Sequence, residues 1–182
     1  MDGKDLIKRV KEDNVKFISL QFSDVTGAVK SVDMPVRHLE DALKDGVWFD
    51  GSSVEGFARI QESDMRLILD PDTYAVLPWS SVESRRARVF CDIFMPNGDP
   101  FEGDPRGTLK RILKKLDERG WTLNVGPEPE FFLFKGTNGE GVHPVPHDTG
   151  GYFDFSSFDE AVVVRTALMD ALDAMGLDVE VG

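Results

Sequence analysis

Two glutamates that stand two residues apart are the strongest candidates for chemistry in this sequence. Glu128 and Glu130 lie in the segment 126–134, which reads Gly-Pro-Glu-Pro-Glu-Phe-Phe-Leu-Phe. On an extended chain such residues share one face, about 6–7 Å apart along the backbone. Carboxylates at that spacing can lean onto two divalent ions held ~4 Å apart, an arrangement that clamps phosphoryl oxygens. Oxygen ligands suit Mg²⁺ or Mn²⁺ better than softer metals.

The alternative is that both glutamates are solvated charges at the mouth of a strand, which is the usual state of such residues. The apolar residues that follow weaken this alternative. Phe132 and Phe134 continue the same face, so we expect the carboxylates to point along a surface that soon becomes core. Charges placed there need partners, and cations are the obvious ones.

A second candidate is an aspartate in the segment 49–57, Phe-Asp-Gly-Ser-Ser-Val-Glu-Gly-Phe. Asp-Gly is a strong signal for a tight turn, so chemistry alone favours a turn with solvated hydroxyls. The functional alternative presents Asp50 on a loop, where its carboxylate would bind a small cation through charge and hydrogen bonds.

Three other candidates for a site fail. His143 and His147 are four residues apart, but Pro144 and Pro146 exclude the helix that would align them, so we expect surface residues. Cys91 has no local base and no disulfide partner, which predicts a small core residue in a reducing cytoplasm. The sequence has neither a Walker-type phosphate loop nor a dinucleotide glycine pattern.

The elements that must position these residues form an α+β arrangement in the first part of the chain. Periodicity predicts helices at 5–13 and 37–44, strands at 15–22, 29–36, 66–69, 74–79 and 88–94, and a long surface loop at 48–64. Loops of that length in compact domains are more often functional than idle.

Proline and glycine cluster at 95–100, which predicts a domain boundary between residues 98 and 99. Domain 1–98 is followed by a second unit, 99–182. There Asp104 is a good N-cap, and an apolar stripe from Leu109 to Leu116 predicts a helix. Further strands are expected at 121–125, 130–134 and 177–181, with a capped helix at 157–175.

Composition indicates a soluble globular protein. The 182 residues are 41% hydrophobic and 30% charged, with a net charge of -12. That charge repels phosphate backbones and anionic lipid, so nucleic acid and membranes are poor partners. The first residues lack the apolar stretch of a signal peptide, and no run approaches the ~20 apolar residues of a membrane span. We therefore expect a cytoplasmic location.

Several motifs occur together in one order along the chain. The main ones are 49–53 followed by Glu-Ser-Asp-Met at 62–65, and Gly-Pro-Glu-Pro-Glu-Phe at 126–131. Supporting pieces are Phe-Ser-Asp-Val-Thr-Gly at 22–27 with Lys30, Asp-Pro-Arg at 104–106, and Gly-Gly-Tyr-Phe-Asp at 150–154. In this combination the sequence closely resembles the type I glutamine synthetases.

The resemblance implies a β-grasp domain followed by the start of a guanido-kinase-like catalytic domain, unrelated to the ATP-grasp fold. It implies that Glu128 and Glu130 hold two divalent ions, Mg²⁺ or Mn²⁺, and that Glu180 contacts ATP. Asp50 would reach into the neighbouring subunit's site to bind ammonium and accept its proton.

The implied chemistry is a ligase reaction of nitrogen metabolism that makes glutamine. The ATP γ-phosphate passes to the side-chain carboxylate of glutamate, and ammonia attacks the resulting γ-glutamyl phosphate. Metal charge does most of the work in the first half. The loop residues Ser52 and Ser53 would support a site between subunits of a double hexameric ring, a homo-dodecamer.

The chain departs from the family pattern in length. A His-His-Glu run expected directly after Gly182 is absent, as are later arginines that bind glutamate and ATP, so we expect the 182-residue chain alone to be inactive. Arg59 either marks the subgroup regulated by glutamine or nucleotide, or is a surface residue. Two alternatives stay open: a ligase that joins another amine to glutamate, and a non-catalytic regulatory or interaction module with this fold.

Overall fold

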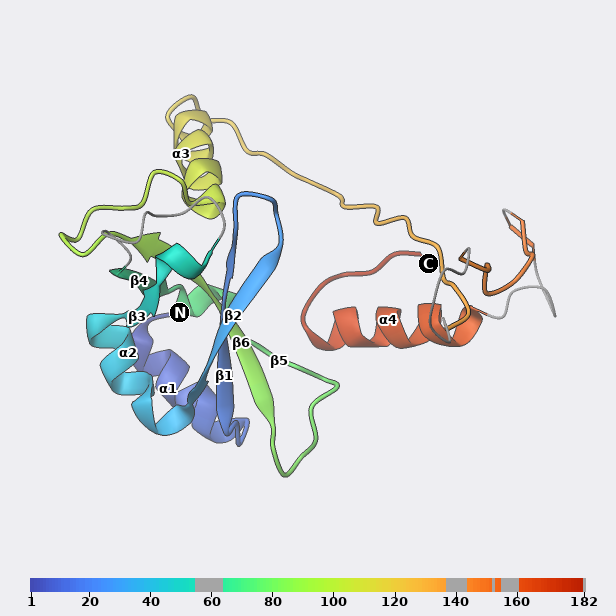
Figure 1. Ribbon diagram of the computed structural model, residues 1–182, viewed down its shortest axis with the longest axis horizontal. Helices are drawn as coiled ribbons and strands as arrows, with labels where there is room; N and C mark the ends of the chain where they lie inside the picture. The colour runs from blue at the N-terminus through green and yellow to red at the C-terminus, as the bar shows by residue number, and fades with distance from the viewer. Residues whose placement is uncertain (55–63, 137–143, 152, 155–160, 182) are drawn as a thin grey trace. The chain divides into compact units, whose positions relative to one another are not determined.

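The computed structural model describes residues 1–54, 64–136, 144–151, 153–154 and 161–181 (Figure 1). They fall into two compact units, Met1–Leu123 and Asn124–Gly182. The first unit contains the sheet and is described first, and the second is described by itself.

A mixed six-stranded sheet organises the first unit. Its strands are β1 (Phe17–Ser23), β2 (Val29–Pro35), β3 (Val47–Asp50), β4 (Asp64–Leu69), β5 (Ala75–Val76) and β6 (Arg86–Phe94). The strand order is β2-β1-β6-β4-β3, and β5 also pairs with β6. The β1–β6 pair is parallel, whereas the other pairs are antiparallel. The crossover from β1 to β6 makes this an α+β sheet and not a simple meander.

Two helices cover the core. Helix α1 (Gly3–Glu12) begins with a capping box in which the Asp2 carboxylate accepts hydrogen bonds from the amides of Lys4 and Asp5, both at 2.8 Å. Helix α2 (Leu39–Asp45) follows the 3₁₀ turn η1 (Val36–His38) and ends at Gly46. Gly46 has φ of 73°, and a Cβ there would lie 2.9 Å from the Leu67 carbonyl oxygen, so the position requires glycine.

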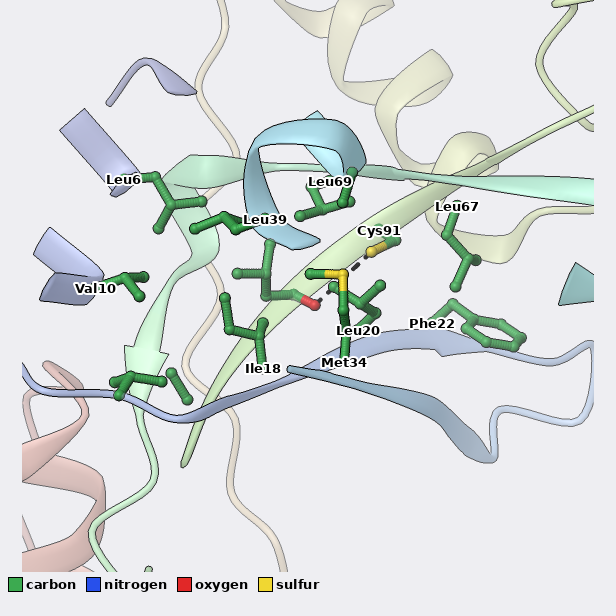
Figure 2. Packing of buried hydrophobic residues seen from close by; sticks show 14 of the residues in the cluster. Leu6, Val10, Ile18, Leu20, Phe22, Met34, Leu39, Leu67, Leu69 and Cys91 are labelled. Carbon is green, nitrogen blue, oxygen red and sulfur yellow. Dashed lines mark hydrogen bonds between the residues drawn. The ribbon is translucent and has the colours of Figure 1, made fainter. Parts of the chain in front are cut away.

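The core forms where these helices meet alternate residues of the strands (Figure 2). Leu6 and Val10 of α1 and Leu39 of α2 are buried in the same cluster as Ile18, Leu20, Leu67 and the inward residues of β6, which are Ala87, Val89, Cys91 and Ile93. Cys91 is a small core residue, as predicted. Burial raises the pKa of its thiol to about 12, which makes the thiol unreactive at neutral pH.

The sequence predictions for the first unit are largely confirmed, with two corrections. The expected loop at 48–64 begins as a strand, because Val47–Asp50 pairs with Leu67–Asp64 and places half-buried Val47 and Phe49 toward the core. Residues 55–63 of that loop lie outside the described residues. The expected strand at 74–79 shortens to Ala75–Val76, since Pro78 cannot donate to the ladder.

Two further helices follow. Helix α3 (Pro105–Asp117) starts at the predicted N-cap, where Asp104 accepts a hydrogen bond from the Arg106 amide. Its apolar stripe, Leu109, Ile112 and Leu113, is exposed in the described part of the chain. In the second unit, α4 (Val162–Ala174) occupies the expected helix at 157–175, whose predicted start lies in residues that the structure does not describe.

The three strands expected beyond α3 are not found. Residues 121–125 and 177–181 have no regular structure, and 130–134 contributes one isolated bridge, Phe134 with Pro146. A strand is stabilised by its neighbours, and the described residues around these segments offer no second strand. Their β-branched and aromatic composition therefore fails to produce a sheet.

The core analysis predicts a strong effect of Leu67, which is fully buried in β4. Leu67→Ala should lower the free energy of unfolding by about 2–5 kcal/mol, through lost burial and the cavity left behind. Urea unfolding followed by far-UV circular dichroism measures this change. The control is Val25→Ala at an exposed turn position, which should change stability by less than about 0.5 kcal/mol. Equal effects of the two substitutions would contradict the assigned core.

Candidate functional site

Asp50 is the last residue of β3 and the N-cap of the 3₁₀ turn η2 (Gly51–Ser53). Its Oδ1 accepts hydrogen bonds from the Ser52 amide at 2.9 Å and the Ser52 hydroxyl at 2.6 Å. Its Oδ2 accepts one from the Ser53 hydroxyl at 2.8 Å. Both serine hydroxyls, which a simple turn would leave to water, therefore donate to one carboxylate.

These donors stabilise the ionised form of Asp50. The Ser52 hydroxyl, followed by the Ser53 hydroxyl, lowers the pKa of Asp50 below its ordinary value of 3.8. The side chain is exposed and lies on an edge strand of the sheet. The arrangement holds a negative charge in a fixed orientation toward the surroundings, which suits a cationic ligand better than proton storage.

Asp64 is directly opposite Asp50 in the antiparallel β3–β4 register. Both residues are exposed. Like charges at facing positions destabilise a strand pair, so a cation near this end of the hairpin would relieve their repulsion. In the sequence Asp64 is part of the motif at 62–65 but not a predicted site residue, because the register that places it opposite Asp50 becomes visible only once β3 is recognised as a strand.

Glu128 and Glu130 are exposed on an irregular segment. The expected strand is absent here, so the structure does not align the two carboxylates by strand periodicity. The prediction that the neighbouring aromatic residues become core is wrong for the described residues: Phe132 is 83% exposed and Phe134 49%. Their rings stack on each other with centroids 6.3 Å apart, a local contact that leaves most of both rings in water.

The remaining predicted site residues are dispersed. Glu180 is exposed on the irregular segment after α4. Arg59 and His143 lie outside the described residues. The His147 amide donates to the Leu133 carbonyl oxygen at 2.8 Å, which makes this position part of the bridge near Phe134.

The carboxylates of Glu128 and Glu130 are the groups expected to bind the divalent ions. Glu128 and Glu130 offer carboxylate oxygens, the ligands that Mg²⁺ and Mn²⁺ prefer. Within the described ranges, however, no group of three or more His, Cys, Asp or Glu side chains is placed to hold a metal ion. The two glutamates thus fit the chemistry of such an ion as part of a ligand set.

Comparison with known families places the sequence of this chain in one group. The family pattern described as "Glutamine synthetase, beta-Grasp domain" matches residues 14–96, and "Glutamine synthetase, catalytic domain" matches residues 102–182. The chain belongs to the glutamine synthetase family. Its fold is accordingly a β-grasp domain followed by the start of the catalytic domain, as the resemblance implied.

Curated glutamine synthetases align along nearly the whole chain. The protein of Methanosarcina mazei is 48% identical over 178 residues, which is 97% of this chain and 40% of the relative. That of Staphylococcus aureus is 46% identical over 178 residues, with the same coverage. The chain therefore spans about two fifths of the length of these relatives.

A solved structure supports the fold. The cryo-electron microscopy structure of Plasmodium falciparum glutamine synthetase covers all of this chain, and 41% of that structure's chain is covered, with a TM-score of 0.79. Identity is 15%, so this likeness concerns the fold alone. Among the described residues, no helix has the length and the apolar character of a membrane span.

The hydrogen bonds at Asp50 predict how its charge is controlled. Replacing Ser52 and Ser53 together by alanine should raise the pKa of Asp50 toward 3.8, because the two hydroxyl donors are lost and the Ser52 amide remains. The measurement is a pH titration of the Asp50 carboxyl carbon by NMR. Ser31→Ala, at an exposed position of β2, serves as the control. An unchanged pKa in the double variant would show that the hydroxyls do not hold the carboxylate in solution.

Proposed function

We propose that this chain supplies the β-grasp domain, residues 1–98, and the opening of the catalytic domain, residues 99–182, of a glutamate–ammonia ligase. The observation that supports this proposal most directly is the Asp50 carboxylate, held by Ser52 and Ser53 at the end of an edge strand in a chain of this family. In the proposed reaction, the ATP γ-phosphate passes to the glutamate side chain, and ammonia displaces it to give glutamine.

Asp50 binds ammonium and takes its proton in this proposal. Its lowered pKa favours the binding of a cation but makes the free carboxylate a weak base. Removing water from around the ion pair raises the basicity of the carboxylate, because a charge without solvent gains more from a proton. Asp50 therefore needs a closed site, which a neighbouring subunit would provide in the proposed double hexameric ring.

The glutamates at 128, 130 and 180 serve the nucleotide half of the reaction. We infer that Glu128 and Glu130 contribute oxygen ligands to Mg²⁺ or Mn²⁺ and that Glu180 contacts ATP. Bound divalent ions would neutralise the charge on the transferred phosphoryl group. The exposure of all three side chains in this chain is consistent with contacts made to other molecules or segments. Arg59 is proposed as a regulatory residue, and the assembled enzyme as cytoplasmic.

The proposal can be tested in a chimera in which residues 1–182 replace the matching segment of the M. mazei glutamine synthetase. The chimera should release ADP in a reaction that requires glutamate, ammonium and Mg²⁺. Glu128→Gln and Glu130→Gln should each lower kcat by about 10²-fold or more, because a neutral amide binds the ions poorly. Coupled ADP release with a Mn²⁺ titration measures both turnover and metal dependence.

The chain alone and a surface variant act as controls for the chimera. The 182-residue chain by itself should show no turnover, and Glu118→Gln, an exposed carboxylate just after α3, should leave the chimera unchanged. Full activity of both glutamine variants at 128 and 130 would reject the assigned ligand role.

A separate prediction concerns the amine half of the reaction. Asp50→Asn keeps the shape and the acceptor oxygen but removes the charge, so it should lower kcat/KM for ammonium by about 10²–10⁴-fold while the KM for ATP stays nearly constant. Steady-state kinetics of the chimera with varied ammonium gives this value, with Asp41→Asn on α2 as the control. An unaffected ammonium dependence, or a preference for a bulkier amine, would favour a ligase for another amine.

A further inference from the structure

Helix α3 is attached to the sheet by a cluster of two cations and two carboxylates. Arg106, in the first turn of α3, donates through Nη2 to Asp70 Oδ2 at 2.5 Å and through Nη1 to Asp92 Oδ1. One turn later, Lys110 Nζ donates to Asp92 Oδ2 at 2.6 Å and lies 3.4 Å from Asp70 Oδ2. Asp70 follows β4 and Asp92 lies within β6, so the guanidinium joins the helix to two neighbouring strands.

This cluster, which we call the Arg106 clamp, is stronger than an ordinary surface ion pair. The side chains of Arg106, Asp70 and Asp92 are 21–23% exposed, whereas the i,i+4 pair of Lys8 and Glu12 is 3.8 Å long and well exposed. Partial burial reduces screening by water, and the planar guanidinium can serve two carboxylates at once. Burial acts to raise the pKa of Asp70, but the hydrogen bond and charge of Arg106, together with the charge of Lys110 and the Asp72 amide, lower it overall.

The backbone before α3 is tied to the same strand. A tight turn at 95–99, closed by the Met95 amide on the Asp99 carbonyl oxygen, sends the chain back along β6. The Phe101 amide donates to the Ile93 carbonyl oxygen at 2.9 Å, and the Ile93 amide donates to Asp104 Oδ2 at 3.2 Å. Both the amide and the carbonyl oxygen of Ile93 thus form hydrogen bonds with the segment that leads into α3. The Asp104 side chain that accepts one of these bonds is buried, since Asp104 is only 2% exposed.

From these contacts we propose that the Arg106 clamp makes α3 part of the β-grasp folding unit, so that the segment between the two family matches is a rigid connection and not a hinge. By sequence α3 falls within the catalytic-domain match, 102–182, but the structure places it in the same compact unit as the sheet. The clamp also anchors the end of β4 next to Asp70. The other end of β4 is Asp64, opposite Asp50, so this strand connects the clamp with the proposed ammonium loop.

Native-state hydrogen exchange of the 182-residue chain tests this proposal without any assay of enzyme activity. In the wild type, the amides of α3 should be protected to about the same degree as those of β6, because they open together. Arg106→Met keeps an unbranched apolar side chain in place of the aliphatic stem and removes the charged guanidinium. It should speed exchange in α3 about tenfold relative to β1 and α1, whereas Arg106→Lys should recover part of the protection.

The matched control is Arg111→Met on the same helix, because Arg111 donates to the Glu102 carbonyl oxygen and the Thr108 hydroxyl but not to the sheet carboxylates. It should leave exchange in α3 within about twofold of the wild type. If Arg106→Met does not fold, Lys110→Met should give the same selective change at smaller size, about threefold. Unprotected α3 amides in the wild type, or equal effects of the Arg106 and Arg111 substitutions, would overturn the proposal.

Discussion

The pairing of β6 with three other strands is the constraint on which the first unit depends. β6 lies between β1 and β4 and also carries β5 (Figure 1). Its burial alternates strictly along nine residues, with Ala87, Val89, Cys91 and Ile93 directed into the core. Because successive side chains of a strand point to opposite faces, the same alternation directs Asp92 away from the core covered by α1 and α2. One strand thus supplies both the inner packing surface and a carboxylate of the Arg106 clamp.

The geometry around Asp50 is a consequence of the same sheet. β3 reaches β6 only through β4, and its four residues leave Asp50 at the end of an edge strand. At that point the chain leaves the ladder, so the backbone can turn and bring the Ser52 and Ser53 hydroxyls onto the carboxylate. In the middle of a strand, a serine two residues further on would share the face of the carboxylate but lie about 6–7 Å away, and a serine three residues further on would point to the opposite face.

The sequence predicted elements whose signals are local and missed those that depend on partners. The cap at Asp104 and the alternation of β6 carry their information within a few residues. The sequence predicts a loop from Trp48 onward, where β3 in fact continues to Asp50, because so short a strand with an exposed Trp48 has no clear hydrophobic period. At 130–134 the sequence predicts a strand that the structure does not contain, because these β-forming residues have no neighbouring strand to pair with among the described residues. Likewise, residue type and spacing indicate Asp50, Glu128 and Glu130 as candidates for cation binding, but the reaction in which they would act comes only from the family resemblance.

The proposed acidic residues are divided between the two compact units. Asp50 with its serine donors belongs to Met1–Leu123, and Glu128, Glu130 and Glu180 belong to Asn124–Gly182. In the first unit, the described residues supply an Asp50 carboxylate that is oriented for a cation. In the second unit, they supply exposed carboxylate oxygens but no group of three or more side chains that could hold a metal ion. Chemistry that uses both groups therefore requires assembly beyond a single unit. A rigid sheet would favour such assembly, because a carboxylate whose orientation is already fixed loses less conformational entropy when a second surface closes over it.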